Sequence, residues 1–377
     1  TIKCVSLELP ISISYHASGV KVDEIASWVG LGWALNAGGV VTRSVVGKSD
    51  ESGFWIQQIK NAQQLTSSDY EYLKSIADGG GDGESDYYFY NFIGRSGKFI
   101  YKQNDSVTPF QIPQSPIVIK YVEQGFEILD EIGNRYIFTQ PETTFLSGGS
   151  TEIVNSAYYL NEVISADGND HIQFTYVLDG GYAEGNMAYT ETIGTRCVQA
   201  GSGTVCGPEH ISNSSTSSRM ILPVRLNEIT FATGKVQFIR DLSRLDLPSG
   251  NSRLSEIRLF AKNNDGSYSS QPIKSFVFGE AYFESGINNY RLKLPDLVEK
   301  DLQGNPIKKH SFSYNESTML PPRGSQAQDW WGFYNGQTQN TSLIATEVEG
   351  VSGVGYNIGS ANREPSAGSM QALVLNK

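Results

Sequence analysis

The second half of the sequence repeats one short pattern four times, and this pattern limits the chain to a β-rich fold. Each copy starts with a leucine, and an acidic residue follows two positions later, directly before Ile, Val or Leu. It continues through a glycine-containing turn into a strand with aromatic residues. The copies begin at Leu160, Leu226, Leu254 and Leu294. A strand, a glycine turn and a second strand make a β-hairpin, because glycine tolerates the positive φ of tight turns.

A single hairpin is only marginally stable in water, so repeated hairpins are expected to pair side by side. In such a stack each hairpin covers the exposed edge of its neighbour. The copies are irregularly spaced, which predicts an imperfect array rather than a propeller with equal blades. The alternative is an ordinary antiparallel domain in which the four copies are alike by chance.

The first part of the chain also favours strands. Apolar and polar residues alternate from Leu7 to Tyr15, which is the period of a half-buried strand. Residues 97–101 read as a further strand, and residues 126–138 read as a hairpin with its turn at Gly133.

One short helix is predicted near residues 68–78. Ser68 is the expected N-cap, and Glu71 would complete a capping box. The predicted fold is therefore all-β, with antiparallel hairpins stacked into a continuous sheet and a single short helix.

The sequence divides into two parts. Residues 1–140 are expected to form an N-terminal β region, and residues 141–377 an irregular hairpin array. Residues 179–221 are polar and rich in Gly and Ser, which predicts a long loop. The chain starts at Thr1 without a methionine and stops at Lys377 without a terminating signal, so we expect a fragment of a longer protein.

The charge and hydropathy patterns exclude two classes of partner. The chain has 29 basic and 40 acidic residues, giving a net charge of −11, and its basic residues are not clustered. A nucleic-acid-binding face needs concentrated positive charge, so no nucleic-acid partner is expected. No apolar run is long enough for a transmembrane helix, so no membrane span is expected.

Three cysteines are present. Cys197 and Cys206 flank a small Gly/Ser-rich loop, a spacing that a disulfide can close in an oxidising compartment. The alternative is two free thiols. Cys4 is expected to be a buried thiol in an apolar strand.

A turn rich in tryptophan and glycine is the most distinctive local motif. Trp28, Gly30, Gly32 and Trp33 form it, and a strand that ends at Arg43 follows. Large rings among glycines predict a tight turn that seats both indoles against closely approaching backbone.

Residues 15–33 (YHASGVKVDEIASWVGLGW) continue directly into residues 34–43 (ALNAGGVVTR). This stretch resembles large bacterial RHS/YD-repeat proteins, in the branch found in bacteria with type IX secretion. The looser pattern of GLGW followed by a strand ending in arginine is similar to the N-terminal region of insecticidal toxin-complex B subunits. Shorter matches to the same branch lie at residues 96–99, 329–336 and 361–363.

The resemblance implies a β-sheet cocoon, in which a ribbon of hairpins winds into a hollow shell around a C-terminal toxin domain. It also implies a secreted protein, extracellular or on the cell surface. The implied partners are the rest of the polypeptide, with its YD-repeat shell and cargo, and the secretion machinery. We expect this segment to be a plug, a cap or the first turns of the shell, without enzymatic activity or a cofactor.

An acidic stretch is a weak candidate for a calcium site. Asp82, Glu84 and Asp86 alternate along the chain and offer carboxylate oxygens. An EF-hand loop starting at Asp82 would need Gly and Glu where Tyr87 and Ile93 stand, so that motif is excluded. The alternative is a solvated loop.

Aromatic residues near the C-terminal end offer a second possible role. Trp330, Trp331 and Tyr334 are close enough in sequence to line a platform that stacks on sugar rings, although core packing is the alternative. The competing hypotheses are therefore a structural shell segment, an adhesin-like module that binds surface glycans or proteins, and a glycoside hydrolase. No motif selects a catalytic carboxylate pair for the last of these.

Overall fold

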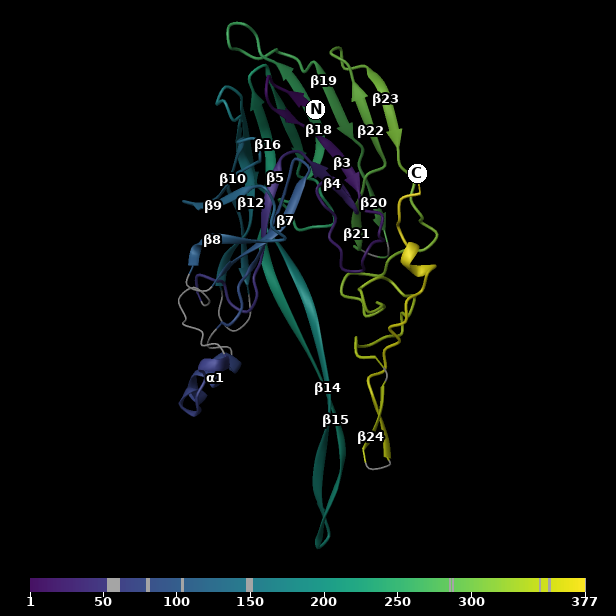
Figure 1. Cartoon of the computed structure of the whole chain (residues 1–377). Coiled ribbons are helices and arrows are strands. Elements are labelled where there is room, and N and C mark those ends of the chain that lie inside the picture. Colours follow the sequence, from purple (N-terminus) through teal and green to yellow (C-terminus); the bar gives the residue numbers. More distant parts are fainter. Residues whose placement is uncertain are drawn as a thin grey trace.

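The computed structural model describes residues 1–52, 62–78, 82–102, 105–146, 152–284, 286, 288–345, 347–351 and 354–376. Strands dominate this part of the chain, and the pairings that build its main sheet are antiparallel (Figure 1). The predicted all-β fold of stacked antiparallel hairpins with one short helix is confirmed.

Eight strands form a closed part of the sheet, which we call the barrel. They are β5 (Gly39–Ser44), β6 (Tyr87–Phe92), β7 (Arg95–Lys102), β8 (Asp105–Ile112), β9 (Val118–Val122), β10 (Gly125–Leu129), β11 (Arg135–Leu146) and β12 (Glu152–Ile164). Pairing follows the order β8-β7-β6-β5-β12-β11-β10-β9, and β8 lies beside β9. Aromatic rings fill the interior: the Phe126 ring centroid lies 5.4 Å from that of Phe99 and 5.1 Å from that of Tyr158.

The predicted hairpin units form the rest of the sheet. Their strands are β13 (His171–Leu178), β16 (Val224–Phe231), β17 (Gly234–Asp241), β18 (Arg253–Ala261), β19 (Lys274–Phe278), β22 (Asp296–Lys300) and β23 (Pro306–Ser311). They continue from β12 in the order β13-β16-β17-β18-β19-β22-β23. Leu160, Leu226 and Leu254 lie in β12, β16 and β18, Leu294 lies just before β22, and all four are buried.

Strand β12 joins the two parts of the sheet. On one edge, residues 157–159 pair with β5 and residues 162–164 pair with β13, while β11 occupies the other edge. The predicted boundary at residue 140 falls inside β11. The two predicted parts therefore share one sheet.

The prediction of a long loop at residues 179–221 is wrong. This stretch forms a hairpin of β14 (Tyr182–Ala200) and β15 (Gly203–Leu222), which extends far from the body as a twisted ribbon (Figure 1). Only residues 219–222 of β15 pair with the main sheet, through β11. A ribbon that stands in solvent needs no apolar face, so the apolar alternation that identifies a strand in sequence is absent.

The helix lies near its predicted position, but its cap differs. The 3-10 turns η1 (Ala62–Gln64) and η2 (Ser67–Asp69) lead into α1 (Tyr70–Ala77). Thr66 and Asp69 form the capping box in place of Ser68 and Glu71: the Asp69 carboxylate accepts the Thr66 N–H at 2.8 Å. The short η2 turn before α1 moves the cap two residues towards the N-terminus.

The remaining elements are small. They are β1 (Ile2–Lys3) with β2 (Glu8–Leu9), β3 (Ser12–Tyr15) with β4 (Trp33–Asn36), β20 (Ala281–Glu284) with β21 (Tyr290–Lys293), β24 (Glu347–Val351) with β25 (Val354–Ile358), and η3 (Ser369–Gln371). The N-terminal segment, residues 1–36, lies across one face of the sheet, where Leu9 and Trp28 share a core with Ile229 and Phe238 (Figure 1). Among the described residues, no helix is long and apolar enough to cross a membrane.

Candidate functional site

The tryptophan turn of the N-terminal segment depends on two glycines with positive φ. Gly30 has φ +152° and Gly32 has φ +74°. A Cβ atom on Gly32 would lie 2.7 Å from the Tyr15 ring, and one on Gly30 would lie 3.2 Å from the Leu294 backbone nitrogen. A side chain on Gly32 would force the Tyr15 ring to shift, and one on Gly30 would crowd the Leu294 backbone, so the glycines allow the turn to approach both the first strands and the last hairpin unit.

Trp33 ties this turn to a distant part of the chain. Its indole is 8% exposed, and its ring centroid lies 4.7 Å from that of Phe312. The indole Nε1–H donates to the Tyr314 hydroxyl at 2.8 Å, and that hydroxyl donates to the Leu294 carbonyl at 2.7 Å. Burial raises the pKa of Tyr314, so its hydroxyl keeps the proton that it donates.

Backbone hydrogen bonds hold the same turn to the sheet. The Leu254 N–H donates to the Trp28 carbonyl at 2.7 Å, and the Leu31 N–H donates to the Leu292 carbonyl at 2.8 Å. The N-terminal segment is thus joined to β18, to β21 and to the strand region around Leu294. These hydrogen bonds hold the N-terminal segment, residues 1–36, in place across the hairpin array, and in this sense the segment is a brace.

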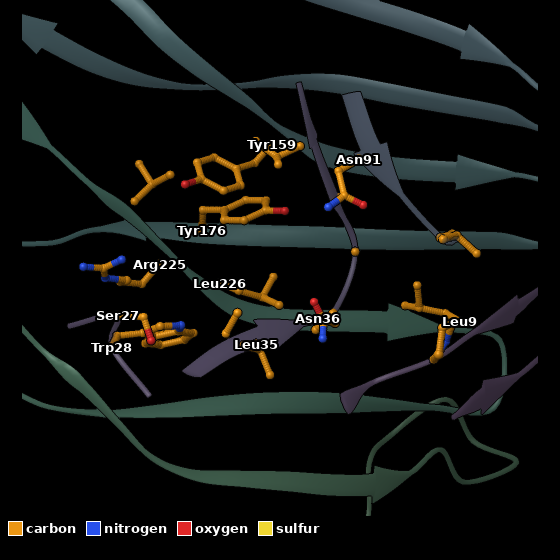
Figure 2. Close-up of a pocket in the computed structure, with 18 of the residues that line it drawn as sticks. Leu9, Ser27, Trp28, Leu35, Asn36, Asn91, Tyr159, Tyr176, Arg225 and Leu226 are labelled. Carbon is orange, nitrogen blue, oxygen red and sulfur yellow. The ribbon is translucent and has the colours of Figure 1, made fainter. Parts of the chain in front are cut away.

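A cleft of about 420 Å³ lies between this segment and the sheet (Figure 2). Most of its polar side chains have hydrogen-bond partners within the protein. Ser27 Oγ accepts the Val29 N–H at 3.1 Å, and the Tyr176 hydroxyl donates to the Leu160 carbonyl at 2.7 Å. The Arg225 Nε donates to the Asp179 carboxylate at 2.9 Å. The cleft therefore lies between two packed layers, and these polar groups form hydrogen bonds within the protein.

Arg43, at the end of β5, organises a buried charge cluster. Its Nε donates to Asp86 Oδ2 at 2.7 Å, and its Nη1 donates to Glu51 Oε1 at 3.1 Å. The carboxylates of Asp50 and Asp86 each accept the backbone N–H of the other, at 2.8 and 3.2 Å. Burial, with the neighbouring Asp86 charge, raises the pKa of Asp50 to about 7. The cluster fastens the turn after β5 to the start of β6.

The three acidic residues proposed for calcium differ in burial and in bonding partners. Asp86 is fully buried and is paired with Arg43, whereas Glu84 is exposed. Asp82 Oδ1 accepts the Glu84 N–H at 3.3 Å. In the described part of the chain, no three His, Cys, Asp or Glu side chains gather to hold a metal ion.

The two cysteines of residues 179–221 lie near the tip of the β14–β15 hairpin. Cys197 and Cys206 are directly opposite in the register, with Cα atoms 3.9 Å apart, and their sulfur atoms are bonded. Cys4 is a partly buried free thiol. The disulfide therefore joins the strands close to the turn at Gly201, far from the main sheet.

The C-terminal aromatic residues do not form a single platform. Trp330 and Trp331 are 54% and 63% exposed, whereas Tyr334 is half-buried and packs against a core cluster. The buried Asp329 carboxylate accepts the Trp331 N–H at 2.9 Å, and the Arg363 guanidinium lies 5.0 Å from the Trp330 ring centroid. Two exposed indoles are therefore held on a braced turn.

Sequence reasoning identified Trp33 and Arg43 but missed their partners. Asp50 and Glu51 closely follow the strand that ends in Arg43, which is the only signal that would have linked them to it. Tyr314 is 281 residues from Trp33, and no local pattern connects the two.

The chain matches no protein-family model, no curated protein and no solved structure.

Proposed function

We propose that this chain is a structural segment of a secreted RHS/YD-repeat protein, extracellular or on the cell surface. In this proposal the hairpin array is part of the wall of a β-sheet shell, and residues 1–36 are its internal brace. The shell would house a C-terminal toxin domain and keep it from solvent until delivery. The segment itself would carry out no reaction.

One observation carries the proposal: the N-terminal segment is bonded to residues that lie more than two hundred positions away in the sequence. The Leu254 N–H to Trp28 carbonyl bond and the Trp33 to Tyr314 bond cross the array at separate points. A wall of hairpins held only by neighbour pairing opens one strand at a time. A brace across several hairpins couples them, so that the wall resists unfolding and proteolysis.

The experiment uses the full-length protein with its C-terminal domain. Limited proteolysis of the wild type should leave that domain intact, and Trp33→Ala should make it susceptible at the same protease concentration. Trp331→Ala, which changes an exposed indole, is the matched control and should behave as the wild type. Rapid digestion of the C-terminal domain in the wild type would contradict encapsulation.

A second candidate function is binding of surface glycans at the Trp330–Trp331 turn. The observation that favours it is the exposure of both indoles on a turn held by Asp329 and Arg363. Indole faces stack on the apolar faces of sugar rings, and a held turn loses little entropy on binding.

A glycan array with the purified chain tests this second function. Binding should be lost in Trp331→Ala and kept in Leu302→Ala, a control at another exposed apolar position. An array without binding by the wild type would remove the candidate and leave the structural proposal untouched.

A further inference from the structure

Apolar side chains are exposed to solvent on the outer surface of three neighbouring barrel strands, β6, β7 and β8. The register sets Phe89 opposite Lys98, Lys98 opposite Ile112, and Ile100 opposite Phe110. We call this surface the β6–β8 face, and its residues are Tyr87, Phe89, Lys98, Ile100, Lys102, Phe110 and Ile112.

Three aromatic rings of the β6–β8 face are partly open to solvent. Tyr87, Phe89 and Phe110 are 40%, 43% and 44% exposed. The Lys98 Nζ lies 4.8 Å from the Tyr87 ring centroid, and the Lys102 Nζ lies 4.3 Å from that of Phe110. Exposed apolar patches on soluble proteins mark contact sites. Because Lys98 and Lys102 are positively charged, the β6–β8 face suits a partner that is apolar and carries negative charge.

Helix α1 has the complementary properties. None of its residues is buried, and Tyr70 and Leu73 are 65% and 44% exposed. Tyr70, Leu73 and Ala77 are spaced i, i+3 and i+7, so they share one side of the helix. An isolated helix of eight residues is not stable in water, so α1 needs a surface that covers this stripe.

Charge and chain length both allow α1 to meet the β6–β8 face. Glu71 and Asp78 are exposed and outnumber Lys74, whereas the Asp69 carboxylate is buried in the cap. The net negative charge of the exposed helix surface complements Lys98 and Lys102. Asp82 is buried and Asp86 is bonded to Arg43, so the connection that can extend runs from Asp78 to Asp82 and spans up to about 14 Å. Strands are about 5 Å apart, so the β6–β8 face is about 10 Å wide, and its Tyr87 edge follows Asp86 directly in the sequence.

We propose that α1 docks on the β6–β8 face of its own chain, with its Tyr70–Leu73–Ala77 side against the aromatic rings and Glu71 beside the lysines. The short connection gives α1 a high effective concentration at this face, which favours it over the helix of a second copy. Docking would cover the exposed rings and prevent the barrel from associating through them. This inference does not depend on the proposed shell.

A cysteine pair tests the docking directly. Leu73→Cys and Phe110→Cys would be combined in a Cys4→Ser background of the whole chain and exposed to a mild oxidant. We expect a disulfide within one chain, formed to the same extent after tenfold dilution. Leu73→Cys with Leu178→Cys, an exposed position on β13, is the matched control. Disulfide-linked dimers, or no more cross-linking than in the control pair, would overturn the proposal.

Proteolysis gives a second, independent measurement. The double variant Phe89→Asp, Phe110→Asp should increase the rate of trypsin cleavage after Lys74 about tenfold, because cleavage follows the population of the undocked helix. Leu178→Asp should leave that rate unchanged. Equal rates in the wild type and the double variant would refute docking of α1 on this face.

Discussion

The indole Nε1–H of Trp33 donates a hydrogen bond of 2.8 Å to the hydroxyl oxygen of Tyr314, which in turn donates to the Leu294 carbonyl at 2.7 Å. This two-step connection joins a turn near the N-terminus to the last hairpin unit of the array. It also satisfies three polar groups that would otherwise be buried without a partner, a state that costs free energy. The turn is therefore part of the core of the protein.

Replacing Trp33 with alanine should lower the free energy of unfolding by about 3–5 kcal/mol, because it leaves a cavity in the core and removes the hydrogen-bond donor of the Tyr314 hydroxyl oxygen. Urea unfolding followed by tyrosine and tryptophan fluorescence measures this change. Trp33→Phe keeps a ring beside Phe312 but removes the hydrogen bond and part of the indole volume, so we expect a smaller loss of about 1–3 kcal/mol.

Trp331→Ala is the matched control, since this indole is exposed and its removal should change the free energy of unfolding by less than about 0.5 kcal/mol. If Trp33→Ala and Trp331→Ala unfolded at the same urea concentration, Trp33 would not be an anchor of the fold.

Features set by neighbouring residues could be predicted from the sequence. The hairpin units at Leu160, Leu226 and Leu254 were recognisable because their turns, acidic residues and aromatic strands are local. The closure of the eight strands β5–β12 into a barrel could not be predicted from the sequence. The contact of Tyr158 with Phe126 depends on pairing between strands far apart in the sequence.

The errors at the candidate site have similar physical causes. The sequence of the β14–β15 hairpin is mostly polar, so it lacks the apolar–polar alternation that identifies a strand from sequence. Trp330 and Tyr334 look equivalent in the sequence, yet one is exposed and the other packs inwards. Residue type does not determine burial, because tertiary packing decides which aromatic side chain reaches the core.

Arg43→Met should destabilise the barrel by about 3–5 kcal/mol, because it leaves the buried Asp86 carboxylate without its counter-charge. Chemical unfolding at neutral pH measures the loss. Arg135→Met removes a partly exposed ion pair with Glu127 in the same barrel and should cost less than about 1 kcal/mol. Equal losses for the two variants would argue against a special role for the cluster at Arg43.

The Asp50 carboxyl should make stability depend on pH. Its pKa in the folded chain is about 7, against an ordinary value of 3.8, because it is buried and lies beside Asp86. The folded chain therefore holds more protons than the unfolded chain between about pH 4 and 7, and stability falls as the pH rises through this range. Asp86 has a raised pKa for the same main reason, while Arg43 opposes both shifts.

Asp50→Asn removes one of these titrating groups and should flatten the pH dependence by on the order of 2 kcal/mol between pH 4.5 and 8. Urea midpoints at several pH values provide the measurement. Asp167→Asn, at an exposed turn, is the control. A variant whose midpoint falls with pH as steeply as that of the wild type would show that Asp50 is not the group responsible.

Removing the disulfide should act only on the end of the β14–β15 hairpin. In Cys197→Ser, Cys206→Ser the strands near Gly201 lose their cross-link, and a two-stranded ribbon in water is only marginally stable. We expect amide hydrogen exchange around the tip to increase at least about tenfold. The urea midpoint of the main sheet should stay unchanged, because β15 joins that sheet only through residues 219–222. Cys4→Ser controls for loss of a thiol and should leave exchange at the tip as in the wild type. A large fall in the urea midpoint of the double variant would mean that the hairpin tip contributes to the core, contrary to its place outside the body in Figure 1.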